Sequence, residues 1–361
     1  MADKVIRVGV VGCGGISNVH MRGINASKDL KLAAICDILP EMMEEKGNMY
    51  GVSRENWFEK YTDMMDSGLV DAITVATPND VHYEVAMAAI ERGIPFAVEK
   101  PVCNSSEEVK EIMDAARKKN IPHMVNFSYR FKGAARYARE IVQSGQLGTI
   151  YHVNGEYLQS WGLPGASKDG EQTPLVWRFM KERTGSGALG DLGCHLIDLV
   201  RFITGREFIY INADTDTFIK QRPMPDGSGM GDVTVDDYVT IMSQLEGQVA
   251  ANLNITRFAY GRGNYQRIEI YGEKGSLRYN LEDETGDSIE INMGNRPMRD
   301  GHCFMTVPVP DHCMSDQLQS FADIINGRAD GLAATLQDGL INAGLLEKVL
   351  ESAKTGEKIK F

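Results

Sequence analysis

The sequence VIRVGVVGCGGIS, residues 5–17, decides the fold of this chain. Val5 to Val11 is an apolar run with the length of a buried strand, and it leads directly into Gly12-Cys13-Gly14-Gly15-Ile16-Ser17. This hexapeptide fits the pattern G-x-G-x-x-G except at its last position. In a strand–loop–helix unit the first glycine permits a tight turn, and the second lets the backbone approach a pyrophosphate at the helix N-terminus. Since serine is small, the stretch still predicts a dinucleotide-binding fold.

Strand and helix patterns alternate through the first third of the chain. The next predicted strands cover 30–36, 70–76, 94–98 and 123–127, and the predicted helices between them include 82–92 and a helix that ends near 120. The second of these helices begins with Ser105-Ser106-Glu107-Glu108, which is typical of a capping box. Strands that alternate with helices indicate a parallel sheet with helices on both faces. We therefore expect a doubly wound, Rossmann-type NAD-binding domain over residues 1–126.

Asp37 ends the predicted strand 30–36 and bears on the choice of dinucleotide. A carboxylate at this place hydrogen-bonds the ribose hydroxyls of NAD, and it repels the 2′-phosphate of NADP. No arginine follows Asp37 within the next few residues. The sequence therefore predicts NAD as the cofactor, with NADP as the weaker alternative.

The sequence pattern changes after residue 127. A predicted helix over 133–144 is followed by long alternating runs at 150–159, 208–218, 235–245, 248–258, 267–271 and 277–280. Glu246-Gly247 and Glu273-Lys274-Gly275 are turn signals between neighbouring runs. Two further helices are predicted near 317–326 and 336–353. The pattern predicts, over residues 127–361, an α+β domain with a large, mostly antiparallel open sheet that has helices on one face.

The composition disfavours several classes of function. The 361-residue chain has a net charge of −12, and nucleic acids and anionic membranes both attract basic surfaces instead. It has neither an apolar run of the ~18–20 residues that a membrane helix needs nor a secretory leader pattern, so we expect a cytoplasmic protein. The six cysteines form no Cys-x-x-Cys pair, and the steps His302-Cys303 and His312-Cys313 are spaced too widely for a usual zinc site. We expect reduced cysteines and no metal.

Lys100 follows the predicted strand 94–98 within Glu99-Lys100-Pro101. In open α/β sheets ligands bind outside the carboxyl ends of the strands, so an amine at this end is a candidate for chemistry. The alternative is a solvated charge where a strand reaches the surface.

A second cluster lies in Gly185-Ser186-Gly187-Ala188-Leu189-Gly190-Asp191-Leu192-Gly193-Cys194-His195. This glycine-rich stretch opens a predicted helix that stops at Gly205. The spacing i, i+4 places Asp191 and His195 on one helix face. A histidine suits proton transfer near neutral pH. The alternative is a capping aspartate beside a buried, satisfied histidine.

Several motifs in order resemble the glucose–fructose oxidoreductase / inositol dehydrogenase / MocA (Gfo/Idh/MocA) family. They are Glu-Lys-Pro at 99–101, Gly-Asp-x-Gly-x-His at 190–195, Thr77-Pro78-Asn79 with His82, Asn126 with Tyr129-Arg130-Phe131, and the stretch around 353–356. The resemblance spans essentially the whole chain. It implies hydride transfer from a secondary ring alcohol to nicotinamide, with a homo-oligomer (a dimer, a tetramer or higher) formed through the second domain.

The resemblance also implies roles for individual residues. His195 would be the base, Asp191 would orient it, and Lys100 would stabilise the developing alkoxide, unless Lys100 is itself the base. The expected cofactor contacts are Gly12, Gly14, Gly15, Ile16, Asp37, Thr77, Asn79, His82, Glu99 and Lys100. The expected substrate contacts are Lys100, Tyr129, Arg130, Gln159, Trp161, Trp177, Arg178, Asp191 and His195.

The substrate contacts carry alternatives of their own. The signature Tyr-Leu-Gln-x-Trp at 157–161 with Trp177-Arg178 resembles a branch of the family that acts on glycosides and anhydrosugars. Aromatic faces stack on sugar C–H faces, but both tryptophans could instead be core anchors of a loop. Tyr129 and Arg130 could line the pocket or brace the domain junction.

The function expected from the sequence is therefore oxidation of a sugar, glycoside or cyclic polyol, plausibly at C3 of a pyranoside. The alternatives are an inositol 2-dehydrogenase, a redox-neutral NAD-dependent glycosidase and a non-catalytic NAD-sensing regulator. The retention of Lys100, Asp191 and His195 together argues against the regulator.

Overall fold

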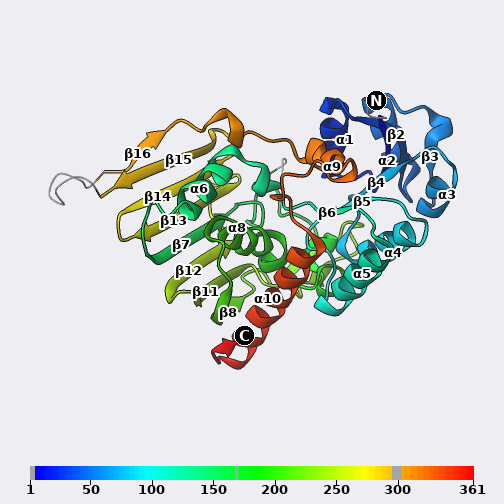
Figure 1. Cartoon of the computed structure of the whole chain (residues 1–361). Helices are drawn as coiled ribbons and strands as arrows, with labels where there is room; N and C mark the ends of the chain where they lie inside the picture. The colour runs from blue at the N-terminus through cyan, green and yellow to red at the C-terminus, as the bar shows by residue number, and fades with distance from the viewer. Residues whose placement is uncertain (1–4, 167–169, 295–302) are drawn as a thin grey trace. The chain divides into compact units, whose positions relative to one another are not determined.

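The computed structural model describes residues 5–166, 170–294 and 303–361. The chain divides into two compact units, Met1–Ser128 with Ser315–Ala343 and Tyr129–Met314 with Gly344–Phe361. Figure 1 traces the first unit in blue and cyan, and the orange helix α9 (Gln317–Ile325) lies beside α1 (Ser17–Ala26) within it. A segment close to the C-terminus thus completes the unit that begins the chain.

The first unit is built on a six-stranded sheet in the order β3-β2-β1-β4-β5-β6. Its strands are β1 Ile6–Val11, β2 Leu30–Cys36, β3 Trp57–Phe58, β4 Ala72–Val75, β5 Phe96–Val98 and β6 His123–Val125. Every neighbouring pair is parallel. This is the strand order of a dinucleotide-binding sheet, and it confirms the predicted Rossmann fold.

Helices connect these strands. They are α1, α2 Pro40–Tyr50, α3 Tyr61–Asp66, α4 His82–Glu91 and α5 Ser106–Lys119, of which the sequence analysis named α1, α4 and α5 but not α2 and α3. Ser105 caps α5 as predicted: its Oγ accepts a hydrogen bond of 3.3 Å from the Glu108 amide and donates one of 3.1 Å to Glu108 Oε2. Among the described residues no helix is long and apolar enough to span a membrane.

The second unit contains a nine-stranded sheet in the order β16-β15-β14-β13-β7-β12-β11-β8-β17. The central pair β7–β12 is parallel and the other pairs are antiparallel, which confirms the mostly antiparallel sheet. The strands are β7 Ile150–Leu158, β8 Phe208–Asp216, β11 Tyr238–Leu245, β12 Val249–Thr256, β13 Tyr265–Gly272, β14 Gly275–Glu282, β15 Gly286–Met293, β16 Met305–Val307 and β17 Ile359–Lys360. Strands β9 Gln221–Pro223 and β10 Met230–Asp232 form a separate ribbon.

Two helices, α6 Gly133–Gln143 and α8 Cys194–Thr204, pack together on one face of this sheet (Figure 1). The short α7 Lys181–Thr184 precedes α8, and α10 Leu336–Thr355 comes near the end of the chain. As predicted, α8 ends at Gly205, whose φ of 64° is left-handed and suits glycine.

The structure corrects two details of the sequence analysis. The predicted strand 235–245 begins only at Tyr238, because Asp236 and Asp237 leave the ladder and their carboxylates accept backbone amides of other segments. Asp191 lies in a π-helical turn, Leu189–Gly193, that precedes α8, and not in the α-helix that the i, i+4 spacing assumed. Both departures lie next to the predicted catalytic residues.

Candidate active site

The glycine-rich loop between β1 and α1 has the close packing that its motif predicts. Gly12 has φ of 92°, and a Cβ there would lie 2.7 Å from the Ala76 backbone, so only glycine fits. Cβ atoms at Gly14 and Gly15 would meet no atom within 4 Å, which leaves this side of the loop open. The Ser17 hydroxyl donates a 2.6 Å hydrogen bond to the Gly14 carbonyl. Serine therefore stands at the position of the third glycine, and its hydroxyl closes the turn through this hydrogen bond within the loop.

Asp37 holds the loop from the end of β2. Its carboxylate accepts hydrogen bonds from the Cys13 amide at 2.7 Å and from the Leu39 amide at 2.9 Å. Burial and the nearby charge of Asp37 raise the pKa of the Cys13 thiol to about 12, so Cys13 stays a neutral packing residue. The aspartate thus lies against the glycine loop, where a ribose is expected.

Ile16 lies directly before α1, and the first helix amides, those of residues 17–19, donate to the carbonyls of residues 14–16. Two buried polar side chains nevertheless fit a bound dinucleotide. Thr77 Oγ1 is buried and has no hydrogen-bond partner within the described part of the chain. The side-chain nitrogen and oxygen of Asn126, at the end of β6, are likewise buried without partners among the described residues. Asn126, which the sequence marks only as part of a family motif, is therefore a further candidate for binding.

We expect Asp37→Asn to relax the preference for NAD over NADP. The substitution keeps an acceptor for the loop amides, but it removes the charge that repels a 2′-phosphate. The ratio of kcat/KM for NAD to that for NADP should fall by about 10-fold or more, as measured in parallel steady-state assays. Glu41→Gln, which removes an exposed carboxylate from the first turn of α2, should leave this ratio unchanged. An unaltered ratio in Asp37→Asn would contradict the ribose assignment.

Lys100 follows β5 in a turn that buried side chains fix in place. The Lys100–Pro101 peptide bond is cis. The His82 ring lies between the Thr77 carbonyl, at 2.9 Å from Nε2, and the Pro101 carbonyl, at 3.0 Å from Nδ1. Burial lowers the pKa of this fully enclosed histidine. His82 therefore ties the Thr77 loop to the Lys100 turn, and its direct contact with a cofactor stays a prediction.

Glu99 supports the same turn from within the unit. His20 Nε2 lies 2.9 Å from Glu99 Oε1, and the Lys100 amide donates to Glu99 Oε2 at 3.3 Å. Burial alone would raise the pKa of Glu99, but the hydrogen bond and charge of His20, with the charge of Lys100, outweigh it and lower the pKa. Sequence reasoning missed His20, because the two partners are 79 positions apart and neither gives a local signal.

In the second unit His195 lies beside two tyrosines. The edge of the Tyr129 ring packs against His195 with a centroid distance of 4.7 Å, and the Tyr157 ring is 6.2 Å away. His195 lies in the first turn of α8, directly after the π-helical turn that carries Asp191. Three predicted residues, Tyr129, Asp191 and His195, thus belong to one unit, whereas Lys100 belongs to the other.

A hydrogen-bonded polar cluster extends from these tyrosines. Tyr157 Oη donates to Asn264 Oδ1 at 2.6 Å and lies 2.6 Å from Tyr129 Oη. Gln159 Nε2 donates to the same Asn264 oxygen at 2.9 Å. Burial and the Tyr129 hydroxyl raise the pKa of Tyr157, so its phenol stays protonated. Sequence reasoning missed Asn264, which precedes β13 in a loop without a motif.

The Arg130 guanidinium forms an ion pair inside the second unit. Its guanidinium donates to both carboxylate oxygens of Asp198 at 2.6 and 2.8 Å, and it lies 5.2 Å from the centroid of the Phe202 ring. Arginine and aspartate are both buried. These contacts give Arg130 a structural role inside the second unit, and both predicted roles, a contact with substrate and a brace at the domain junction, stay predictions.

Trp161, Trp177 and Arg178 lie on the loop that follows β7. The Trp161 ring packs 5.3 Å from Phe179, in a cluster with the buried residues Leu175, Val233 and Val235. The Arg178 guanidinium lies 4.5 Å over the Trp177 ring. Trp161 thus anchors the loop through its partly buried face, while the Arg178 side chain is exposed.

One group of metal-ligating side chains stands out among the described residues. Glu140, His312 and Cys313 bring their donor atoms within 4.8 Å of one another. A 2.7 Å hydrogen bond between His312 Nε2 and Glu140 Oε2 accounts for the approach of the two exposed residues. His302 lies outside the described residues, and the absence of a metal stays a prediction.

Comparison with known proteins agrees with these features. Residues 6–127 match the oxidoreductase family with an NAD-binding Rossmann fold, and residues 135–278 match the Gfo/Idh/MocA C-terminal domain. Levoglucosan dehydrogenase of Pseudarthrobacter phenanthrenivorans is 34% identical over 297 residues, which are 77% of this chain and 74% of that protein. Inositol 2-dehydrogenase of Rhizobium meliloti is 26% identical over 362 residues, or 99% of each chain.

A solved structure of levoglucosan dehydrogenase in complex with NADH and levoglucosan has a TM-score of 0.87 and 30% identity, with 98% of this chain and 99% of that chain covered. D-glucoside 3-dehydrogenase of Escherichia coli is 30% identical over 208 residues, which are 57% of this chain and 56% of that protein. The chain thus carries the glycine loop, the Lys100 turn and the Asp191–His195 segment. It belongs to the Gfo/Idh/MocA family of NAD-dependent oxidoreductases, among dehydrogenases of sugars and polyols.

Proposed function

We propose that the chain oxidises a secondary ring hydroxyl of a sugar, glycoside or cyclic polyol to a ketone, and that in a pyranoside the oxidised position is C3. The observation that carries the proposal is the cluster of Tyr129, Tyr157, Gln159 and Asn264 beside His195. Hydroxyl and amide groups next to an imidazole suit a ligand with several hydroxyls, one of which must lose a proton. Two relatives, D-glucoside 3-dehydrogenase and glucose-6-phosphate 3-dehydrogenase, are named for position 3.

NAD, when bound, supplies the hydride acceptor. The open side of the glycine loop before α1 would hold its pyrophosphate, and Asp37 would bind the ribose. Thr77, Asn79 and the remaining residues predicted from the sequence would complete this binding site.

Three side chains of the protein would act on the proton and on the developing charge. His195 takes the hydroxyl proton, and Asp191 orients the imidazole or hydrogen-bonds the substrate. The Lys100 ammonium stabilises the negative charge that develops on the reacting oxygen. The fixed turn around Lys100, with Glu99 and His82 behind it, supports this role, because a preorganised donor needs no rearrangement during the reaction.

An inositol 2-dehydrogenase is the second candidate. The inositol 2-dehydrogenase of Rhizobium meliloti covers nearly the whole chain, although at lower identity than levoglucosan dehydrogenase. A cyclic polyol presents the same ring hydroxyls to the polar cluster as a pyranoside does. The two candidates differ in substrate and not in the reaction.

A substrate screen tests the proposal. The purified protein with NAD is offered levoglucosan, methyl β-D-glucopyranoside, glucose and myo-inositol, and NADH formation is followed by its absorbance. We expect turnover with a pyranoside or anhydrosugar, and a loss of about 100-fold or more in His195→Asn, because general-base catalysis contributes 10²–10⁴-fold. Turnover with myo-inositol alone would favour the second candidate. Binding of NAD without any turnover would contradict both candidates.

A further inference from the structure

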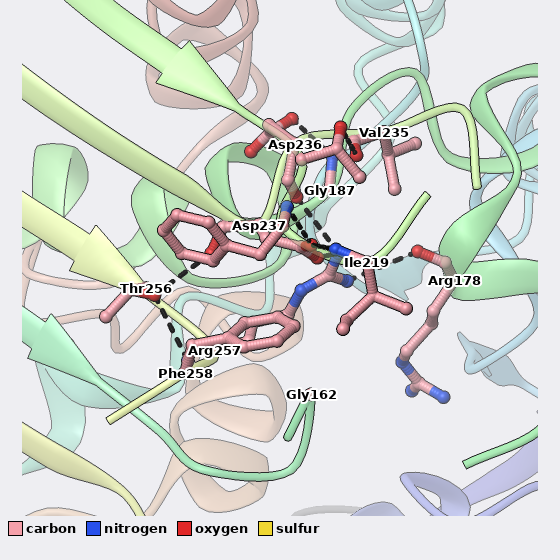
Figure 2. Close-up of polar contacts among 12 residues, drawn as sticks. Gly162, Arg178, Gly187, Ile219, Val235, Asp236, Asp237, Thr256, Arg257 and Phe258 are labelled. Carbon is pink, nitrogen blue, oxygen red and sulfur yellow. Dashed lines mark hydrogen bonds and ion pairs between the residues drawn. The ribbon is translucent and has the colours of Figure 1, made fainter. Parts of the chain in front are cut away.

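A buried ionic group lies next to the segment that carries Asp191 and His195. Arg257, directly after β12, and Asp237 are fully buried, and Asp236 is nearly so. Arg257 Nη2 donates to the Asp236 carbonyl at 2.9 Å and to Asp237 Oδ1 at 3.1 Å. Figure 2 shows this guanidinium at the centre of the group, with the Arg178 carbonyl on its other side at 3.3 Å from Nη1.

Asp236 holds three successive amides of the turn before the π-helical segment. Its two carboxylate oxygens accept from the Gly187 and Leu189 amides, each at 2.7 Å, and its carbonyl accepts from the Ala188 amide at 2.9 Å. The approach is so close that a Cβ at Gly187 would lie 2.0 Å from the Asp236 carbonyl oxygen. The Asp191 amide then bonds to the Gly187 carbonyl at 2.9 Å. The start of the helical segment is therefore fixed to one aspartate.

Arg257 connects the same group to the loop that carries Trp161 and Arg178. Its guanidinium lies 4.8 Å from the Trp161 ring centroid and 5.0 Å from that of Phe179. Its carbonyl accepts the Gly162 amide at 3.0 Å, and its guanidinium bonds to the Arg178 carbonyl (Figure 2). One residue thus contacts the loop of the predicted substrate residues and the aspartate that holds the catalytic segment.

We propose that Asp236 and Arg257 are positioning residues that fix Asp191 and His195 relative to the predicted substrate residues Trp161 and Arg178. This inference rests on the proposed function, in which Asp191 and His195 act on the substrate. Neither Asp236 nor Arg257 needs to touch the substrate for this role. Misplacement of catalytic groups by about 1 Å can cost about 100-fold in rate, so such a support matters for kcat.

Asp237 provides a matched control for Asp236. Both aspartates are buried next to Arg257, but Asp237 Oδ2 accepts from the Phe218 and Ile219 amides, at 2.8 and 3.2 Å, and not from the Gly187–Leu189 turn. An asparagine at 236 places an NH₂ group against one of the two backbone N–H groups of the 187–189 turn, and an asparagine at 237 places it against either the Arg257 guanidinium or the 218–219 amides. The two substitutions therefore disturb the same buried group but different backbone segments.

The test compares Asp236→Asn, Asp237→Asn and His195→Asn as full-length proteins, well below their melting temperatures, with the substrate found in the screen. We expect Asp236→Asn to lower kcat by about 10- to 100-fold with the KM for NAD unchanged. We expect Asp237→Asn to lower the Tm by about as much as Asp236→Asn does, but to keep kcat within about 3-fold of the original. If Asp236 had only a structural role, the two substitutions would lower kcat by similar factors. Equal kcat losses in the two aspartate variants, or a normal kcat in Asp236→Asn, would overturn the inference.

The His195→Asn arm separates this inference from the proposed function. A nearly inactive His195→Asn protein together with a normal Asp236→Asn protein would overturn the positioning role alone, whereas an active His195→Asn protein would overturn the proposed chemistry. If Asp236→Asn does not fold, Gly187→Ala replaces it, because the added Cβ displaces the turn while both carboxylates remain. A normal kcat in Gly187→Ala would then overturn the inference.

Discussion

Replacing Lys100 with methionine is expected to lower kcat by about 100- to 1000-fold while the Kd for NAD stays nearly the same. Methionine keeps most of the side-chain volume and removes the ammonium that would stabilise the developing alkoxide. The turn that carries this residue should persist, because His82 and Glu99 hold it through backbone groups. Steady-state kinetics with the substrate found in the screen, together with a fluorescence titration of NADH, measure the two quantities.

Lys110→Met is the matched control for this substitution. Lys110 is an exposed lysine on α5, and its ion pair with Asp114 lies on the surface. Its loss should change neither kcat nor the Kd for NAD. A Lys100→Met protein with a kcat within a few-fold of the original would remove Lys100 from the chemistry and leave the solvated-charge alternative.

Replacing Arg130 with methionine is expected to lower the free energy of unfolding by about 3–5 kcal/mol, because the substitution leaves the buried Asp198 carboxylate without its cation. The pair is bidentate and enclosed, with Phe202 against the guanidinium. Urea denaturation, followed by tryptophan fluorescence, gives the difference. The double substitution Arg130→Met/Asp198→Leu should recover part of the loss, since it removes both charges.

Arg92→Met is the matched control, because it breaks a pair with similar geometry that is not buried. Arg92 also contacts both oxygens of an aspartate, Asp66, at 2.7 and 2.9 Å, but this aspartate is well exposed. Surface pairs of this kind contribute about 0–1 kcal/mol. Equal losses in Arg92→Met and Arg130→Met would show that burial of the Arg130–Asp198 pair is not the source of its effect.

The sequence predicted the parts of the fold that depend on local patterns. The strand and glycine loop of residues 5–17 led to the observed β1–loop–α1 unit, and the alternation of apolar residues led to most of the second sheet. The strands β15, β16 and β17 of this sheet were missed. β15 reads GDSIEINM, with three acidic or amide side chains around its two isoleucines, so its apolar alternation is short.

The structure added contacts between residues far apart in the sequence. Asp236 bonds to Gly187, 49 positions earlier in the chain. This contact accounts for the shorter strand, and it lies directly before the π-helical turn. Local periodicity contains no information on such a contact, because a buried aspartate and an exposed one look alike in a sequence. Asn264 and His20 were missed for the same reason, since each acquires its partners only in the folded chain.

The proposed function is tested most directly by following the hydrogen on the reacting carbon. The substrate from the screen is prepared with deuterium at the carbon that becomes the ketone, for a pyranoside plausibly C3, and is incubated with NAD and the purified protein. Nuclear magnetic resonance should then find the deuterium at C4 of the reduced nicotinamide, together with a keto sugar in equal amount. Deuterium that appears in water, or that stays in the sugar without reduced nicotinamide, would contradict direct hydride transfer from the ring carbon.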